Sequence, residues 1–214
     1  MISESGVKPD YWEQAVETLI AQDRVMRKLI PMHQEVCLNA KQGAFVVLAR
    51  ALIVQRMSAL KGQQVWTQFK KLCANNMNPA GVLALGMEQL NAVGITKHKA
   101  ECLLDLADSF ANKKVQPTRW SKMADEEIIA ELTTIRGIGI WTAQMFLIFN
   151  LHRPDVLPYE DPRLVQAIST QYFSGEPVSR YEMKELAENW APWRTVATWY
   201  LWCSLNAHST NSKL

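Results

Sequence analysis

The feature that most constrains this chain is the stretch of residues 132–143, with the sequence LTTIRGIGIWTA. A helical apolar periodicity precedes it at residues 125–132, and a second, very apolar helical segment follows at residues 140–150. Gly137 can adopt the positive φ that a tight reversal of the chain requires. Gly139 places no side chain between the backbone and an approaching ligand. The pattern predicts two helices joined by a short hairpin.

The hairpin also has the properties of an anion-binding site. The first N–H groups of a helix have no partners within the helix and lie at the positive end of its dipole. Phosphate is an anion that such a helix end binds readily. Because Gly137 and Gly139 open the backbone here, we expect the hairpin to bind the phosphate backbone of DNA. The alternative interpretation is a glycine-rich turn between helices that binds no ligand.

Composition is typical of a globular protein. The chain has 214 residues, of which 48% are hydrophobic, enough to bury a sizeable core. Its net charge of +2 is weak evidence for a nucleic-acid partner, although many DNA enzymes are basic only locally. The first residues show no basic segment followed by an apolar core, so we expect no signal peptide. The apolar runs are too short to span a membrane.

The cysteines indicate which metal sites to expect. Four of them are scattered along the sequence without a Cys-x-x-Cys pair. Structural zinc sites and iron–sulfur clusters use closely spaced cysteines, so we expect neither. Free thiols in a cytosolic protein are the default interpretation.

Apolar periodicity predicts an all-α fold of nine or ten helices. No segment has a convincing strand pattern, and there is no internal repeat. The expected helices cover about residues 11–30, 44–57, 59–73, 87–93, 97–111, 125–132, 140–150, 163–173, 179–190 and 192–206.

Three segments together resemble the helix-hairpin-helix DNA glycosylases, and within them the alkylpurine (3-methyladenine) DNA glycosylase II branch. The first is the hairpin. The second is DVLPYED at residues 155–161, and the third is WAPWRTVATWYLW at residues 190–202. Weaker matches, VQRMS at residues 54–58 and GITKHKA at residues 94–100, extend the resemblance over about residues 10–206.

The resemblance implies a single domain over residues 1–214 that consists of two helical lobes with the active cleft between them. The central lobe would span about residues 40–150 and contain the hairpin. The second lobe would combine the N-terminal helix, about residues 10–30, with the C-terminal helices, about residues 160–206. Some relatives carry an N-terminal β domain, and we expect none here because the sequence starts directly at its first helix.

Asp161 lies where the family has its catalytic aspartate. A negative charge there stabilises the oxocarbenium character that develops on the sugar as an N-glycosidic bond breaks, and it can orient or deprotonate the attacking water. Asp161 followed by Pro162 is also a good helix start, with the aspartate as N-cap. Both roles favour the ionised carboxylate. Glu160 and Asp155 are the rival carboxylates.

Aromatic and apolar residues are the candidates for the base pocket. Trp141 lies where bifunctional relatives carry their Schiff-base lysine, which implies a monofunctional enzyme. An aromatic face at this position would attract a cationic alkylated base. Met145 would add an apolar wall, and Trp202 matches another pocket aromatic of the branch. The alternative for Trp141 and Met145 is a role in the core of the protein.

Two basic residues and the hairpin backbone are the candidates for DNA contacts. Arg56 lies at the position where relatives insert a residue into the base stack, and the alternative for it is a phosphate contact. Lys97 is a candidate backbone contact, with simple solvation as the alternative. A hard monovalent cation is expected at backbone carbonyls. The hairpin groups expected to take part are the amides of Gly137, Gly139 and Thr142 and the carbonyls of Thr133, Ile135 and Gly137.

These features predict a monofunctional enzyme of the DNA-3-methyladenine glycosylase II type, active in base-excision repair. It would flip an alkylated purine, chiefly 3-methyladenine or 7-methylguanine, out of double-stranded DNA and hydrolyse its glycosidic bond without a required cofactor. We expect a monomer without a membrane partner, in the cytoplasm of a bacterium and associated with DNA. The alternatives are a non-catalytic DNA-binding module and a glycosylase for deaminated or mispaired bases.

Overall fold

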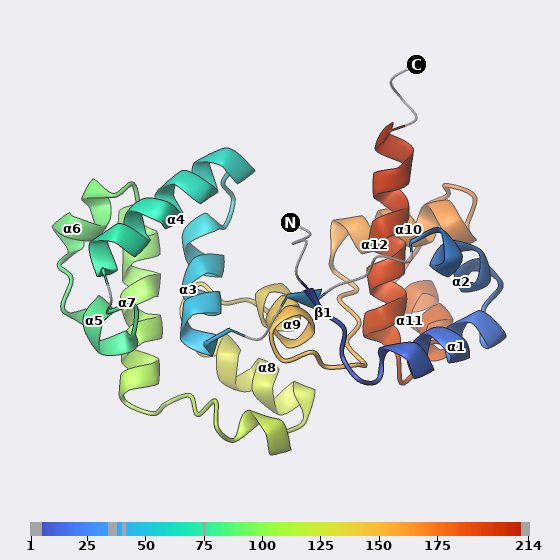
Figure 1. Ribbon diagram of the computed structural model, residues 1–214, viewed down its shortest axis with the longest axis horizontal. Helices are drawn as coiled ribbons and strands as arrows, with labels where there is room; N and C mark the ends of the chain where they lie inside the picture. The colour runs from blue at the N-terminus through green and yellow to red at the C-terminus, as the bar shows by residue number, and fades with distance from the viewer. Residues whose placement is uncertain (1–5, 34–37, 40–41, 75, 211–214) are drawn as a thin grey trace. The chain divides into compact units, whose positions relative to one another are not determined.

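The computed structural model of the chain describes residues 6–33, 38–39, 42–74 and 76–210. Almost all of the regular secondary structure in its described part is helical (Figure 1), so the predicted all-α class is confirmed. The chain divides into two compact units, one of Met1–Ala40 with Leu147–Leu214 and the other of Lys41–Phe146. The sequence had placed this division at about residues 40 and 150.

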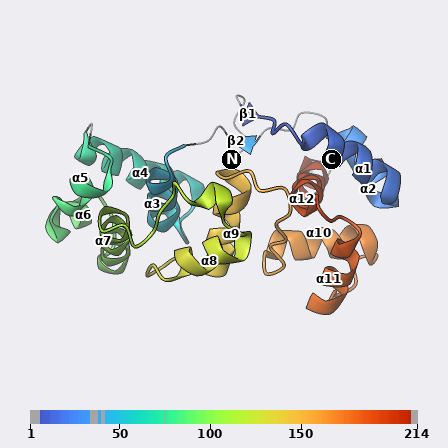
Figure 2. The same ribbon diagram turned by 90° about the horizontal axis from the view of Figure 1, so that it is seen from below.

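The Lys41–Phe146 unit is built around two long helices that pack against each other, α3 and α7. α4 packs on α3, whereas α5 and α6 pack on α7 (Figures 1 and 2). Trp120 is buried in this unit, with its ring edge-on to Phe110 and Phe146. The elements of this unit are α3 (Ala44–Val54), α4 (Ala59–Cys73), α5 (Pro79–Leu83), α6 (Met87–Ala92), α7 (Lys97–Ala111), the 3-10 turn η2 (Trp120–Lys122), α8 (Asp125–Thr133) and most of α9 (Ile140–Phe149).

The other unit joins the two ends of the chain around its last helix, α12, which packs against α10, α1 and α2. A short antiparallel pair, β1 (Gly6–Val7) with β2 (Leu38–Asn39), belongs to the same unit. No strand was predicted here, because two-residue strands are too short for an alternating pattern. The helices of this unit are α1 (Trp12–Gln22), α2 (Arg24–Leu29), the 3-10 turn η1 (Ile30–Met32), α10 (Pro162–Tyr172), α11 (Arg180–Glu188) and α12 (Arg194–Thr210).

Asp23 accounts for the main error in the predicted helices. The single helix expected over residues 11–30 is interrupted at Asp23, whose backbone is extended, with φ −123° and ψ 122°. Its Oδ1 accepts the backbone N–H groups of Val25 and Met26 and so starts α2. Its Oδ2 accepts the hydroxyl of Tyr172 at 2.8 Å and the indole N–H of Trp190 at 2.9 Å. A side chain that caps a new helix therefore overrides the continuous apolar periodicity.

The helix α5 is a second difference from the prediction, which placed no helix between residues 73 and 87. Asn78 is its N-cap, with Oδ1 accepting the N–H of Gly81 at 2.8 Å, and Pro79 lies in its first turn. The helix is only five residues long, too short to leave an apolar periodicity in the sequence.

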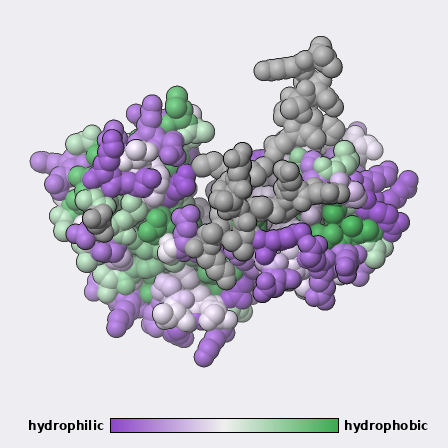
Figure 3. All heavy atoms as spheres, in the orientation of Figure 1, coloured by the Kyte–Doolittle hydropathy of each residue, from purple (hydrophilic) through white to green (hydrophobic). Residues whose placement is uncertain are grey.

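On the face drawn in Figure 3, hydrophilic side chains cover most of the margins, and apolar side chains form patches between them. Among the described helices, none combines the length and the apolarity needed to cross a bilayer. Large apolar side chains that are exposed include Leu60 at the start of α4 and Ile140 and Trp141 at the start of α9.

Asp23→Ala is expected to lower the free energy of unfolding by about 3–5 kcal/mol. It removes a helix cap and leaves the Tyr172 hydroxyl and the Trp190 N–H without their acceptor, at roughly 1–3 kcal/mol for each buried donor. Urea unfolding followed by circular dichroism measures the change. Asp10→Ala, at an exposed aspartate, is the control and is expected to change the stability by less than about 0.5 kcal/mol. Equal stabilities for the two variants would contradict the anchoring role of Asp23.

Candidate active site

The hairpin between α8 and α9 reverses at Gly137, which has a φ of +86°. A Cβ atom at this position would lie 2.9 Å from Cys102 Sγ and 3.0 Å from Leu52 Cδ2. Gly137 is therefore required for the backbone conformation of the hairpin. It is also required because the hairpin backbone lies directly against side chains of α3 and α7. Arg136 is tied down as well, because its backbone N–H donates to Asp105 Oδ2 at 2.9 Å.

Gly139 faces open space, since a Cβ atom at this position would meet no atom within 4 Å. The helical ladder of α9 begins at the next turn, where the N–H of Ala143 donates to the carbonyl of Gly139 at 3.0 Å. The first N–H groups of α9 thus lie next to an exposed glycine, as an anion site requires. Thr142, in this first turn, is buried apart from about 8% of its surface.

Trp141 is exposed over 43% of its surface, which excludes the alternative that it is a core residue. Met145 and Phe149 follow it at intervals of four residues on α9 and are half-buried, whereas most other residues from Thr142 onward are buried. The less buried stripe of this apolar helix is therefore made of one indole, one thioether and one phenyl ring.

Asp161 is the N-cap of α10, and Pro162 follows it in the first turn, as the sequence predicts. Its Oδ1 accepts the N–H of Leu164 at 2.8 Å and the indole N–H of Trp202 at 2.9 Å. Only 4% of the residue is exposed. The aspartate is thus held from two helices, by the backbone of α10 and by a side chain of α12.

Glu160 and Asp155, the rival carboxylates, are engaged elsewhere. Glu160 is exposed and forms an ion pair with Arg180, whose guanidinium also lies 4.0 Å from the ring centroid of Tyr159. Asp155 forms a bidentate ion pair with Arg194, with both N···O distances at 2.6 Å. Arg194 therefore makes a structural salt link to the segment that leads to Asp161.

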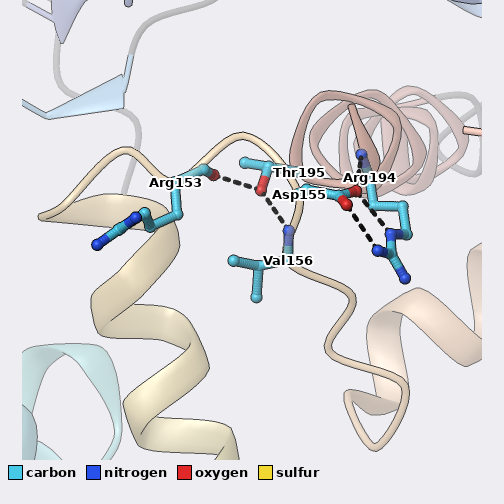
Figure 4. A network of polar contacts seen from close by, with 5 residues as sticks. All are labelled: Arg153, Asp155, Val156, Arg194 and Thr195. Atoms are coloured by element: carbon cyan, nitrogen blue, oxygen red, sulfur yellow. Dashed lines mark hydrogen bonds and ion pairs between the residues drawn. The ribbon is translucent and has the colours of Figure 1, made fainter. Parts of the chain in front are cut away.

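The segment that leads to Asp161 is fastened to the first turn of α12 (Figure 4). Thr195 Oγ1 donates to the carbonyl of Arg153 at 2.6 Å and accepts the N–H of Val156 at 3.0 Å. The N–H of Thr195 donates to the carbonyl of Pro154 at 3.0 Å. Together with the Arg194–Asp155 pair, these bonds fix residues 153–156, and Trp202 fixes Asp161 farther along the same helix.

Trp202 also packs face to face with Phe149, with ring centroids 5.7 Å apart and an interplanar angle of 15°. Trp199, one turn earlier on α12, meets Phe149 edge-on and Trp12 at an interplanar angle of 83°. Trp193 stacks on Tyr11 at 5.8 Å. Trp193 and Trp199 are thus packing residues, whereas Trp202 joins an aromatic stack to the aspartate.

The basic candidates differ in their surroundings. Arg56 is exposed, in the turn after α3, with a φ of +55°. Lys97 is exposed at the start of α7, but Lys99 is half-buried and donates from Nζ to the carbonyls of Ile53 and Gln55, both at 2.7 Å. Lys99 is therefore bound to the end of α3, whereas Lys97 is exposed to solvent.

The structure places the expected site residues in two groups. Asp161 and Trp202 belong to the unit that contains both chain ends, where they contact each other. The hairpin, Trp141, Met145, Arg56 and Lys97 belong to the Lys41–Phe146 unit. Among the described residues there is no group of three or more His, Cys, Asp or Glu side chains suited to a metal ion.

Comparison with known proteins decides the family. DNA-3-methyladenine glycosylase 1 of Schizosaccharomyces pombe is 30% identical over 167 residues, which cover 76% of this chain and 72% of that protein. The chain belongs to the DNA-3-methyladenine glycosylase family. No family model matches the chain.

Solved structures agree with this family. A DNA-3-methyladenine glycosidase from Bacillus halodurans superposes with a TM-score of 0.85 and 28% identity, covering 92% of this chain and 91% of the other. The Schizosaccharomyces pombe 3-methyladenine DNA glycosylase in complex with abasic DNA gives a TM-score of 0.77 at 25% identity, covering 88% and 95%. The helix-hairpin-helix glycosylase fold inferred from the motifs is confirmed.

Sequence reasoning missed three residues that support the glycosylase site. The ring of Phe149 stacks on Trp202, and Thr195 hydrogen-bonds to the segment before Asp161. Lys99 hydrogen-bonds to the C-terminal end of α3. Phe149 could have been found from its four-residue spacing after Trp141 and Met145. Thr195 and Lys99 left no such signal, because their partners are backbone groups about 40 residues away.

The two hairpin glycines are expected to respond differently to substitution by alanine. Gly137→Ala forces a β-carbon into a positive φ and against Cys102 and Leu52, so it should lower the free energy of unfolding by about 2–4 kcal/mol. Gly139→Ala meets open space and should cost less than about 1 kcal/mol. Urea unfolding of both variants measures the difference. A Gly137→Ala variant as stable as Gly139→Ala would show that the hairpin does not depend on this glycine.

Proposed function

We propose that this chain is a monofunctional DNA glycosylase that removes alkylated purines, chiefly 3-methyladenine and 7-methylguanine, from double-stranded DNA in base-excision repair. The observation that carries the proposal is Asp161, a buried carboxylate held by both α10 and Trp202 at the family's catalytic position. The relatives' names, DNA-3-methyladenine glycosylases, support the choice of lesion.

The proposed reaction is hydrolysis of the bond between C1′ of the sugar and the purine nitrogen. The electron pair of that bond leaves with the base and neutralises its positive charge, so no strong general acid is needed. The negative charge of Asp161 stabilises the oxocarbenium character at C1′. A water molecule then adds to C1′ and gives up a proton, for which Asp161 is the nearby base.

Asp161 is preferred to the rival carboxylates because of their partners. The charge of Asp155 is matched by a bidentate guanidinium, and Glu160 is exposed and paired with Arg180. Asp161 instead is almost fully buried, and its Oδ1 accepts the N–H groups of Leu164 and Trp202. These two donors fix the orientation of the carboxylate at the start of α10.

The target base lies inside the duplex, so the proposal requires that the nucleotide flips out. The exposed hairpin at Gly139 would bind backbone phosphate through the amides of Gly137, Gly139 and Thr142, and Lys97 would add a contact at a second turn. A hard monovalent cation at the carbonyls of Thr133, Ile135 and Gly137 would suit their oxygen ligands. Arg56 would occupy or border the gap in the base stack.

Trp141 in the place of the Schiff-base lysine supports base removal without strand cleavage, because an indole cannot form an imine with the sugar. We also propose that the enzyme acts as a monomer, associated with DNA in a bacterial cytoplasm. The main alternative is a non-catalytic module that only grips DNA, and a glycosylase for deaminated or mispaired bases is the second. The test is release of free base from methylated duplex DNA, which an enzyme catalyses and a non-catalytic DNA-binding module does not.

Asp161→Asn is expected to abolish base release while DNA binding survives. The amide keeps the size of the side chain and its acceptor oxygen for the α10 cap, but it removes the charge that stabilises the developing cation. The measurement is single-turnover release of 7-methylguanine, with DNA affinity determined in parallel. Glu160→Gln makes the same chemical change at an exposed neighbour and is expected to release base at close to the wild-type rate. Release by Asp161→Asn within a few-fold of wild type would rule out the assignment.

Trp141→Leu is expected to slow release of 7-methylguanine more than release of neutral hypoxanthine. Only the cationic base loses a cation–π partner, which is worth about 0.5–2 kcal/mol, or at most about thirtyfold in rate. The measurement is the ratio of single-turnover rates on the two lesions at saturating enzyme. Tyr181→Leu removes another exposed aromatic ring and should leave the ratio unchanged. An equal fall on both lesions would show that Trp141 does not read the charge of the base.

A further inference from the structure

The ammonium group of Lys99 closes the C-terminal end of a neighbouring helix. Its Nζ donates to the carbonyls of Ile53 and Gln55, both at 2.7 Å. Lys99 lies in the first turn of α7, and Ile53 lies in the last turn of α3, on which α7 packs. Both distances are typical of charge-assisted hydrogen bonds.

These two carbonyls lie at the C-terminal end of α3, where no N–H group of the same helix is available to donate to them. The last four carbonyls of a helix have no intrahelical partner and lie at the negative end of its dipole. Around them, the Gln55 N–H still bonds to Ala51 and the Met57 N–H bonds to Val54, at 3.1 and 3.0 Å. Lys99 therefore supplies, from another helix, a cationic cap that is more often found within the same helix.

The turn that Lys99 holds contains a strained residue. Arg56, directly after Gln55, has a φ of +55°, a left-handed conformation that residues with a side chain rarely adopt. Its side chain is exposed, and Ser58 begins α4 two residues later by capping Lys61. A left-handed arginine persists only when the surrounding structure fixes the backbone on both sides. Lys99 fixes the side toward α3, and the Ser58 cap fixes the side toward α4.

Lys99 is also unlike a surface lysine in its environment. It is half-buried, and partial burial lowers the pKa of its ammonium group. Its neighbours Lys97 and His98 are exposed. The three residues that follow Thr96 thus divide into two that face solvent and one that reaches back to α3.

We propose that Lys99 is a positioning residue for DNA binding, which holds the turn after α3 so that Arg56 is presented to the DNA. This inference rests on the proposed function, because it assigns Arg56 a contact with DNA. Through Lys99, the start of α7 and the turn before α4 are fixed to each other, so that Lys97 and Arg56 are presented by one connected backbone.

A double-mutant cycle tests whether Lys99 acts through Arg56. The probe is a duplex with a single tetrahydrofuran abasic-site analogue, and the measurement is its dissociation constant. Lys99→Met is expected to weaken binding about tenfold, as if the competent turn were populated about one tenth of the time. In the Arg56→Ala background, the same substitution should have almost no further effect. Lys99→Arg, which retains the charge and the donors, should bind within about threefold of wild type.

Lys122→Met is the control for the loss of one positive charge, because Lys122 is an exposed lysine of the same unit. It is expected to bind the probe with close to wild-type affinity. A Lys99→Met effect that persists undiminished in the Arg56→Ala background would overturn the proposal, since Lys99 would then contact DNA itself. Wild-type affinity for either Lys99→Met or Arg56→Ala would overturn it as well.

A second measurement does not depend on DNA binding or on catalysis. An arginine-specific protease cuts the bond between Arg56 and Met57 only when the turn opens, and the rate follows the open population. Lys99→Met should raise this rate about tenfold relative to wild type, and Lys122→Met should not. If the wild-type protein neither binds the probe nor releases methylated bases, the proposed function fails, and the protease rate still reports whether Lys99 holds the turn. An unchanged rate would overturn the positioning role.

Discussion

A carboxylate buried in a protein must be hydrogen-bonded, and two such groups organise the unit that joins the ends of this chain. Asp23 starts α2 and Asp161 starts α10, and each also accepts an indole N–H, from Trp190 and Trp202 respectively. The two tryptophans are the first and last residues of the 190–202 segment. An unpaired buried donor costs roughly 1–3 kcal/mol, so each tryptophan and its aspartate fix each other.

This arrangement makes α12 the helix that fixes the position of the proposed catalytic group, Asp161. Its first turn binds residues 153–156 through Arg194 and Thr195, and Trp202 binds Asp161 two turns later. The aspartate therefore depends on three attachments to one helix, in addition to its own helix cap. A reacting carboxylate benefits from such support because small displacements of a catalytic group reduce the rate steeply.

In the Lys41–Phe146 unit, two exposed turns keep a defined backbone conformation. They are the hairpin at Gly137 and Gly139 and the turn at Arg56. Gly137 lets the hairpin turn directly against α3 and α7, and Gly139 leaves the start of α9 open. The turn at Arg56 has no glycine and is held by Lys99 instead. Both turns present polar backbone or a cation on a helical scaffold, which suits a ligand with a repeating phosphate backbone.

The sequence by itself determined the helical class, the hairpin and the N-cap at Asp161, because each depends on neighbouring residues. Apolar periodicity located most helices, although it missed the break at Asp23 and the five-residue α5. The resemblance placed Asp161 at the catalytic position and left Asp155 and Glu160 as rivals. Only the tertiary structure showed the partner of each carboxylate: Arg194 for Asp155, Arg180 for Glu160 and Trp202 for Asp161. These partners lie 39, 20 and 41 residues away in the sequence, where no local pattern reaches, so only the fold decides which groups lie beside each carboxylate.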